Sequence, residues 1–127
     1  SDSYNNAIFQ ESFIVGLSNE TSDLETGSDK ISFRVPFNFL LQEIRGSLNV
    51  ASTGSSVIVN LNVDGSSILS TPLSIDAGQL TSTTASVLPV FSSSLIPDDS
   101  RVSLDIDQIG STTAGAGLKI TLSGRRG

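Results

Sequence analysis

The sequence predicts an all-β protein, an antiparallel β-sandwich of jelly-roll type with about eight strands and an N-terminal arm. Apolar and polar residues alternate with a period of two in several runs, whereas helix-period patterns are nearly absent. Clusters of Gly, Asp, Pro and Ser separate these runs at the spacing of a sandwich or barrel. The 127 residues, 37% of them hydrophobic, fit a single domain with its own core.

The N-terminal part differs from the rest of the chain. We expect residues 1–29 to form an arm or first strand with an acidic spacer, and residues 30–127 to form the β-sandwich domain. The stretch "AIFQESFIVGL" (7–17) is apolar enough for a strand, and "SNETSDLETGSD" follows it. The segment could add an edge strand, reach onto a neighbouring subunit, or be only a first strand and a loop.

Four runs predict strands with one buried face: residues 44–50, 57–63, 102–107 and 118–122. In the third run, Val102, Leu104 and Ile106 are expected to face the core and Ser103, Asp105 and Asp107 to face solvent. Asp64-Gly65 is a hairpin signal after the second run. Residues 76–79, 96–100 and 110–117 supply the other turns. The last of these, "GSTTAGAG", lacks the ending of a phosphate-binding loop, so we expect a flexible connection between strands.

Composition excludes several classes of function. The chain has no Cys and no His, which removes disulfides, thiolate metal sites, the usual zinc sites and the Ser-His-Asp triad. We assign no catalytic residue and no cofactor, and we expect no enzyme. A net charge of −6 disfavours nucleic acid and anionic membranes as partners. No apolar run approaches the ~20 residues that cross a bilayer and no secretion signal is visible, so synthesis in the cytoplasm is expected.

The acidic residues offer a weak metal hypothesis. Calcium could be held by Asp98, Asp99, Asp105 and Asp107, with Asp64 or Asp76. No EF-hand pattern is present, and the alternative is a solvated strand face plus a turn that favours Asp. Two same-face carboxylates on a strand could also suit a glycosidase, but such enzymes need a pocket with aromatic platforms, and the chain has one Tyr and no Trp.

Two stretches are candidates for subunit contacts. "ISFRVPFNFLL" (31–41) carries three of the six Phe residues and is expected in the core, any exposed part being an interface. "TSTTASV" (81–87) suits an edge strand that displays hydroxyls, or a surface that packs on a neighbour. Together with the apolar N-terminal segment, they give the interface candidates Ile8, Phe9, Phe13, Ile14, Phe37, Phe39, Thr81 and Thr83.

Residues 31–124 resemble a small domain that recurs in structural proteins of tailed bacteriophages, notably marine ones. The matching stretches are "ISFRVPFNFLLQEIRGSLNVAST", "VIVNLNVDGSSILSTPLSID", "TSTTASV" and "DDSRVSLDIDQIGSTTAGAGLKITLSG". The ordered series covers about three quarters of the chain. The resemblance implies a β-sandwich used as a virion building block, with no catalytic residues to carry over.

The resemblance gives two expectations of function. The first is a non-enzymatic capsid decoration or cement protein that binds the major capsid protein or neighbouring subunits. The second is a tail, fibre or head-fibre protein that meets the host surface, with the 110–117 loop facing glycan. Both imply location in the virion and a homo-oligomer, a trimer being one option.

Overall fold

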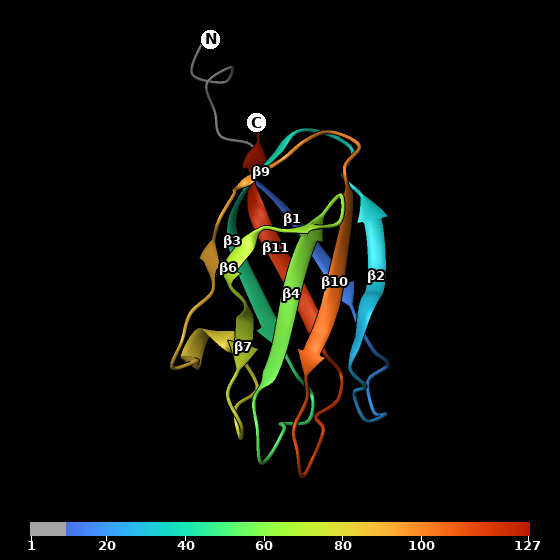
Figure 1. The fold of residues 1–127 in the computed structure, drawn as a ribbon, viewed down its shortest axis with the longest axis vertical. Coiled ribbons are helices and arrows are strands. Elements are labelled where there is room, and N and C mark those ends of the chain that lie inside the picture. The colour runs from blue at the N-terminus through green and yellow to red at the C-terminus, as the bar shows by residue number, and fades with distance from the viewer. Residues whose placement is uncertain (1–9) are drawn as a thin grey trace.

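The computed structural model describes residues 10–127, and its regular structure consists of β-strands and one short 3-10 helix (Figure 1). In chain order the elements are β1 (Gln10–Gly16), β2 (Gly27–Arg34), β3 (Phe39–Ser47), β4 (Val57–Val63), β5 (Ser66–Ser67), β6 (Leu69–Thr71), β7 (Leu73–Ile75), η1 (Ser82–Thr84), β8 (Val90–Phe91), β9 (Leu95–Ile96), β10 (Arg101–Gln108) and β11 (Lys119–Arg126). The all-β prediction is confirmed. The described residues form eleven strands, not about eight, because the chain from β5 to β9 is broken into pieces of two or three residues.

All strand pairs are antiparallel, and they build two main sheets. The β11 sheet has the order β1-β11-β3-β9, and the β10 sheet has the order β2-β10-β4-β5, with β7 also paired to β4. Strands β6 and β8 form a small separate pair. The β10 sheet lies in front in Figure 1 and the β11 sheet behind it.

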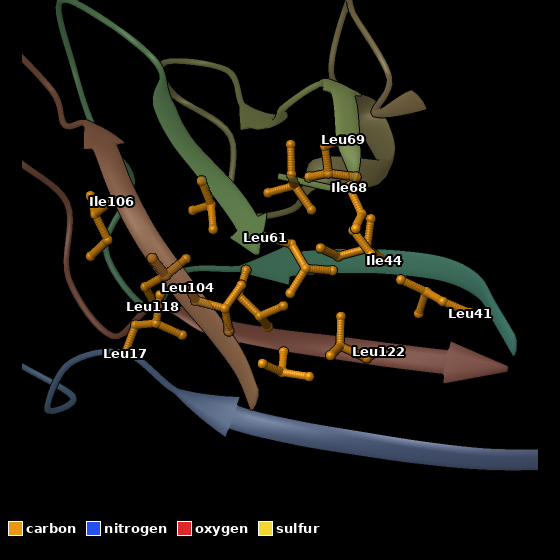
Figure 2. Close-up of a cluster of buried hydrophobic side chains, with 14 of the residues drawn as sticks. Leu17, Leu41, Ile44, Leu61, Ile68, Leu69, Leu104, Ile106, Leu118 and Leu122 are labelled. Carbon is orange, nitrogen blue, oxygen red and sulfur yellow. The ribbon is translucent and has the colours of Figure 1, made fainter. Parts of the chain in front are cut away.

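Side chains from both sheets meet in one hydrophobic core (Figure 2). The predicted alternation holds in β4, β10 and β11, where every second residue is buried. The fully buried large side chains of this core include Phe39, Leu61, Leu73, Ile75, Leu104, Ile106, Ile120 and Leu122. Two expectations on exposure were wrong. Ser103 is buried at 4% exposure, and Val50 is 46% exposed because β3 ends at Ser47.

Gly46 on β3 packs closely against side chains of both sheets. A Cβ atom there would lie 3.0 Å from Leu73 Cδ2 and 3.2 Å from the Cδ1 atoms of Ile75 and Ile120. The first two of these side chains belong to the β10 sheet and the third to the β11 sheet. A larger residue at Gly46 would therefore push on the core from its centre.

The predicted hairpin turn at Asp64-Gly65 is confirmed. It connects β4 to β5, and both residues have positive φ, +50° and +86°. Two successive positive φ values are typical of the two-residue turn that Asp-Gly favours. The Asp64 carboxylate accepts the Arg101 N–H at 3.0 Å, so the turn also fixes the start of β10.

The N-terminal part belongs to the sheets from Gln10 onward. β1 pairs with β11 along its whole length, from the pair Gln10–Arg125 to the pair Gly16–Lys119. β2 begins at Gly27, so the boundary expected between residues 29 and 30 falls inside a strand. Of the segment expected as an arm, only residues 1–9 lie outside the described residues.

The 110–117 connection was expected to be flexible, but the structure anchors it on both sides. Isolated bridges join Thr113 to Thr53, and Ala116 to both Val50 and Asp23. Gly117 has φ +70°, and a Cβ atom there would lie 2.5 Å from Asn49 Nδ2. The small residues serve close packing of this loop against its neighbours.

Candidate interaction surface

Five large aliphatic side chains lie exposed in residues 80–95, between β7 and β9. Their exposed fractions run from 47% to 58%, and they form the apolar rim: Leu80, Val87, Leu88, Val90 and Leu95. The segment follows the left side of the molecule in Figure 1, in yellow to orange. Two other large hydrophobic residues of the described chain are exposed, Ile14 and Val50. Most of the exposed apolar surface is therefore concentrated on one edge.

The rim follows the outer edge of β3. At one end Leu95 pairs with Leu40, and at the other the carbonyl of Leu80 accepts the Leu48 N–H at 2.9 Å. Leu40 lies on β3 and Leu48 directly follows it, and their separation of eight residues corresponds to about 27 Å at roughly 3.4 Å per residue. The rim is thus a long surface, held at both ends by β3.

A hollow of about 300 Å³ lies between β3 and the rim. Its lining residues are Gln42, Glu43, Ile44, Arg45, Ser82, Thr83, Leu88, Pro89 and Phe91. Within the described chain, β9 pairs with β3 at Phe39 and Leu40, and the next bridge on that edge joins Ser47 to Thr81. The hollow therefore occupies the stretch of the β3 edge that lacks a neighbouring strand.

Residues 81–87 were expected to form an edge strand, and this prediction was wrong. The Thr81 hydroxyl caps η1 by accepting the Thr83 N–H at 3.2 Å, so the chain turns instead of extending. Ser82 is buried, and its hydroxyl accepts the Gly46 N–H at 2.8 Å. Of the two interface candidates in this stretch, Thr83 lines the hollow and Thr81 makes the bridge to β3.

The rim carries no charge. Residues 77–97 contain no Asp, Glu, Lys or Arg, although the whole chain has a net charge of −6. At the hollow, Glu43 and Arg45 neutralise each other in an ion pair with an N–O distance of 3.0 Å. Covering this surface therefore leaves no charge buried without a partner, which is the costly case.

A second exposed apolar side chain lies on the outer surface of β1. Ile14 is 70% exposed, while its neighbours Phe13 and Val15 pack against the core. In the register of the β11 sheet, Ile14 is opposite Thr121, and Ser12 is opposite Ser123. On this outer face Ile14 is surrounded by the small residues Ser12, Gly16, Thr121 and Ser123, and charged side chains border them: Lys119 on β11, and Glu43 and Arg45 on β3.

The phenylalanines lie mainly inside. Phe39 is fully buried, and Phe13 contacts it edge to face with ring centroids 5.3 Å apart. Phe37 is half-buried, and the guanidinium carbon of Arg126 lies 4.3 Å from its ring centroid. Phe39 therefore belongs to the core and is no interface residue, and Phe13 and Phe37 are largely covered by the chain itself. Ile8 and Phe9 lie outside the described residues.

Asp105 connects strands. Its carboxylate accepts the Asp29 N–H at 2.7 Å and the Asn62 side-chain amide at 2.9 Å. The register between β10 and β2 shifts once, at Asp105: Leu104 pairs with Ile31, but Ile106 pairs with Gly27. Where the regular pairing of β10 with β2 is interrupted, the Asp105 carboxylate thus accepts a backbone N–H of β2 in place of a backbone carbonyl.

The calcium candidates are not brought together. Asp98 and Asp99 precede β10, which begins at Arg101, whereas Asp107 lies near its far end, six residues beyond Arg101 and about 20 Å from it at roughly 3.3 Å per residue. Asp64 and Asp76 accept backbone N–H groups, from Arg101 and Ser86. Within residues 10–127, no three acidic side chains are grouped as a metal site requires.

Asp107 lies near the end of β10, two residues beyond Asp105. Partial burial, and secondarily the negative charge of Asp105, raise the pKa of Asp107 above its ordinary value. Its side chain is nonetheless exposed on the surface. Neither Asp105 nor Asp107 lines the hollow beside β3 or the smaller hollow near Leu17 and Ile106.

Sequence reasoning missed the rim. It selected Thr81 and Thr83 from this region but not the aliphatic residues that carry most of the exposed surface. One usable signal was the run 77–97, which lacks charge in an acidic chain and still contains six Leu, Val or Ile residues. Period-two alternation could not reveal it, because this part of the chain forms short, irregular pieces.

Comparison with known proteins found no matching family model, no matching curated protein and no matching solved structure. Within residues 10–127 there is also no helix with the length and apolarity that crossing a membrane requires. The surface chemistry described above therefore carries the functional argument.

Proposed function

We propose that the chain is a non-enzymatic structural protein of a phage virion, a capsid decoration or cement protein that binds the head shell through protein–protein contacts. The observation that carries the proposal is the apolar rim. It is a long, uncharged surface with no grouped titratable side chains, which suits contact with another protein better than chemistry on a small substrate. The resemblance of residues 31–124 to a virion domain points to the same role.

The strand orders support a jelly-roll sandwich. The chain crosses between the sheets at β1 to β2, β2 to β3, β3 to β4, β9 to β10 and β10 to β11. Each of the two sheets thus contains strands from both ends of the described chain. Such Greek-key crossing is the pattern by which jelly rolls enclose a core, and it is common in capsid proteins.

The energetics favour many weak contacts over a single strong one. Full burial of one aliphatic side chain contributes about 1.5–3 kcal/mol, so covering five half-exposed ones gives about 4–8 kcal/mol. Association itself costs roughly 4–15 kcal/mol. One rim contact is therefore marginal, and attachment requires several contacts per copy or many linked copies. A repetitive shell supplies that condition.

A tail, fibre or head-fibre protein that contacts the host surface is the second candidate. Its proposed glycan-facing loop, residues 110–117, offers little free surface, because Gly115, Ala116 and Gly117 are buried and only Ser111 and Thr112 are exposed. This candidate would use the same rim for assembly, and another part of the molecule for the host.

Electron microscopy of virions from the encoding phage tests the proposal. An antibody fragment raised against residues 10–127 is expected to label the whole head. Label confined to the tail or to isolated projections would establish the fibre candidate instead. Purified virions without any label, in a preparation where the capsid antibody control does label, would exclude both.

A further inference from the structure

The edge of β3 that faces the apolar rim is paired at both ends and open between them. Before the gap, Leu41 donates its N–H to the Ser94 carbonyl at 2.8 Å. After the gap, Gly46 donates its N–H to the Ser82 hydroxyl at 2.8 Å. Residues 42–45 have no neighbouring strand on this side within the described chain, and they lie beside the hollow of about 300 Å³. The gap therefore has the length of a short extended segment.

A β-bulge opens the gap. Ser123 and Gly124 are consecutive on β11, but their partners on β3 are Glu43 and Leu41, so Gln42 is an extra residue. A bulge bends its strand and interrupts regular pairing, and β9 pairs with β3 only before the bulge. The gap thus originates within β3 itself.

The main chain of Ile44 points into this gap. Alternate residues of a strand direct their N–H and C=O groups to the same side. Gly46 and Leu48 direct their N–H groups to Ser82 and Leu80, away from β11. Ile44, two residues before Gly46, therefore directs both of its groups toward the hollow, and neither has a hydrogen-bond partner within the described chain. A free donor and a free acceptor on one edge residue are the groups with which an added strand pairs.

Charge and register define the segment that fits. The two charged residues that line the hollow, Glu43 and Arg45, pair with each other at 3.0 Å, so a charged occupant would lose water without gaining a partner. Cross-strand partners share one face of a sheet. The residue opposite Ile44 would lie on the inner face, where Leu88 and Phe91 add apolar lining, and its neighbours would lie on the outer face. An aliphatic residue between two uncharged polar ones therefore fits.

The long strands of a second copy do not fit. The chain itself closes the gap at both ends, at Leu41 and Gly46. The long free edges of the described chain are those of β1, with 7 residues, and β2, with 8 residues, and both are longer than the open stretch 42–45. Two copies would also each bring a charge of −6, which the hollow cannot offset because its own charges are paired. These observations favour a different protein as the source of the segment.

We propose that the β3 edge at Ile44 binds a short, uncharged, extended segment of another virion protein, which hydrogen-bonds to the Ile44 N–H and C=O and places an aliphatic side chain in the hollow. The inference rests on the proposed function for the source of the segment, and it deepens that function by naming what the rim receives. A segment with so few contacts binds weakly, in the millimolar range, which agrees with attachment through many copies.

Hydrogen exchange of the free chain, measured by NMR, tests whether the Ile44 N–H is free. The Ile44 amide should exchange about tenfold faster than the Gly46 and Leu48 amides, each of which has an acceptor. Equal protection of all three amides would overturn the proposal, because the Ile44 donor would already be occupied.

Titration with the peptide acetyl-Thr-Val-Thr-amide tests binding. The Ile44 amide signal should shift and saturate in the millimolar range. The same peptide with a methylated valine nitrogen cannot donate to the Ile44 carbonyl and should leave the signal in place. Equal shifts from both peptides would refute strand pairing, and so would the absence of any shift with the first.

Two chain variants locate the bound peptide. Leu88→Ser removes apolar lining and should weaken peptide binding about tenfold. Val50→Ser is the matched control, because Val50 is 46% exposed and does not line the hollow, and it should bind as the parent chain does. Equal weakening in both variants would place the peptide elsewhere and overturn the proposal.

Two further measurements separate the site from the source of the segment. Light scattering of the chain alone should give the mass of one chain, 13.2 kDa. A dimer that Leu88→Ser dissociates would show that a second copy fills the hollow, against the proposal. If the peptide does not bind while the antibody still labels the head, the strand site is wrong and the virion role stands. If the peptide binds but the head is not labelled, the site stands and the virion source is wrong.

Discussion

Replacing Asp105 with Ala should destabilise the fold without affecting any chemistry. The carboxylate accepts two hydrogen bonds, from the Asp29 backbone N–H at 2.7 Å and from the Asn62 amide at 2.9 Å. Both donors come from strands that flank β10, so the substitution loosens the centre of the β10 sheet. Asp107, two residues along the same strand, makes no side-chain hydrogen bond within the described chain and provides the matched control.

The magnitude follows from the two bonds. A hydrogen bond to a charged group contributes about 1.5–3 kcal/mol, and the half-buried position of Asp105 places its bonds at the lower end because water partly replaces them. Losing both should therefore lower the free energy of unfolding by about 3 kcal/mol. With a urea dependence of roughly 2 kcal/mol per molar, the unfolding midpoint falls by about 1.5 M. For Asp107→Ala the change should stay within about 0.5 kcal/mol.

Urea unfolding followed by circular dichroism measures both variants against the parent. Equal midpoint shifts for Asp105→Ala and Asp107→Ala would refute the reasoning, because the structure gives only the first residue a role between strands. A midpoint unchanged in Asp105→Ala would likewise show that the bond to Asp29 contributes nothing at the interruption of the β2–β10 pairing.

Four further outcomes follow from other sites. Gly46→Ala places a methyl group against three core side chains and should cost about 1–3 kcal/mol, measured by thermal melting; Gly16→Ala, where a Cβ atom would meet only the Ser18 backbone oxygen at 3.8 Å, is the comparison for a strand glycine without such contacts. Deleting residues 1–29 removes β1 and the start of β2, so circular dichroism should show an unfolded chain. Because the pKa of Asp107 is raised in the folded state, its contribution to stability falls as pH rises through that pKa; Asp107→Asn should therefore unfold at higher urea than the parent near pH 7, with the difference lost by about pH 3. Calcium chloride should leave the melting temperature unchanged, since no three carboxylates converge within residues 10–127; a rise would contradict the separation of Asp99 from Asp107.

The long strands could be predicted from the sequence because their burial alternates. Leu104 and Ile106 on β10, like Ile120 and Leu122 on β11, occupy the core positions that period-two spacing assigned to them. Asp64-Gly65 was equally predictable, since the turn needs two positive φ values that few residue pairs tolerate. In these elements, local sequence and tertiary structure favour the same conformation.

The rest depended on contacts between distant residues. The Ser82 hydroxyl accepts the Gly46 N–H, thirty-six residues away in sequence, and no local pattern encodes that bond, which attaches the buried Ser82 to β3. The role of Asp105 likewise requires knowing that Asp29 lies beside it. Loop 110–117 was expected to be flexible from its small residues, yet those residues are what allow it to pack closely against residues 49–53.

The central positions of β10 and β11 have a consequence for synthesis of the protein. These are the last two strands of the described chain, yet each lies between two strands made earlier, β2 and β4 in one sheet and β1 and β3 in the other. While residues 101–126 are still inside the ribosome, neither sheet can close, and the edges of β1 and β3 have no partner. A chain that terminates before residue 101 lacks the central strand of both sheets and stays exposed to proteases, and the second sheet is complete only once translation has passed β11.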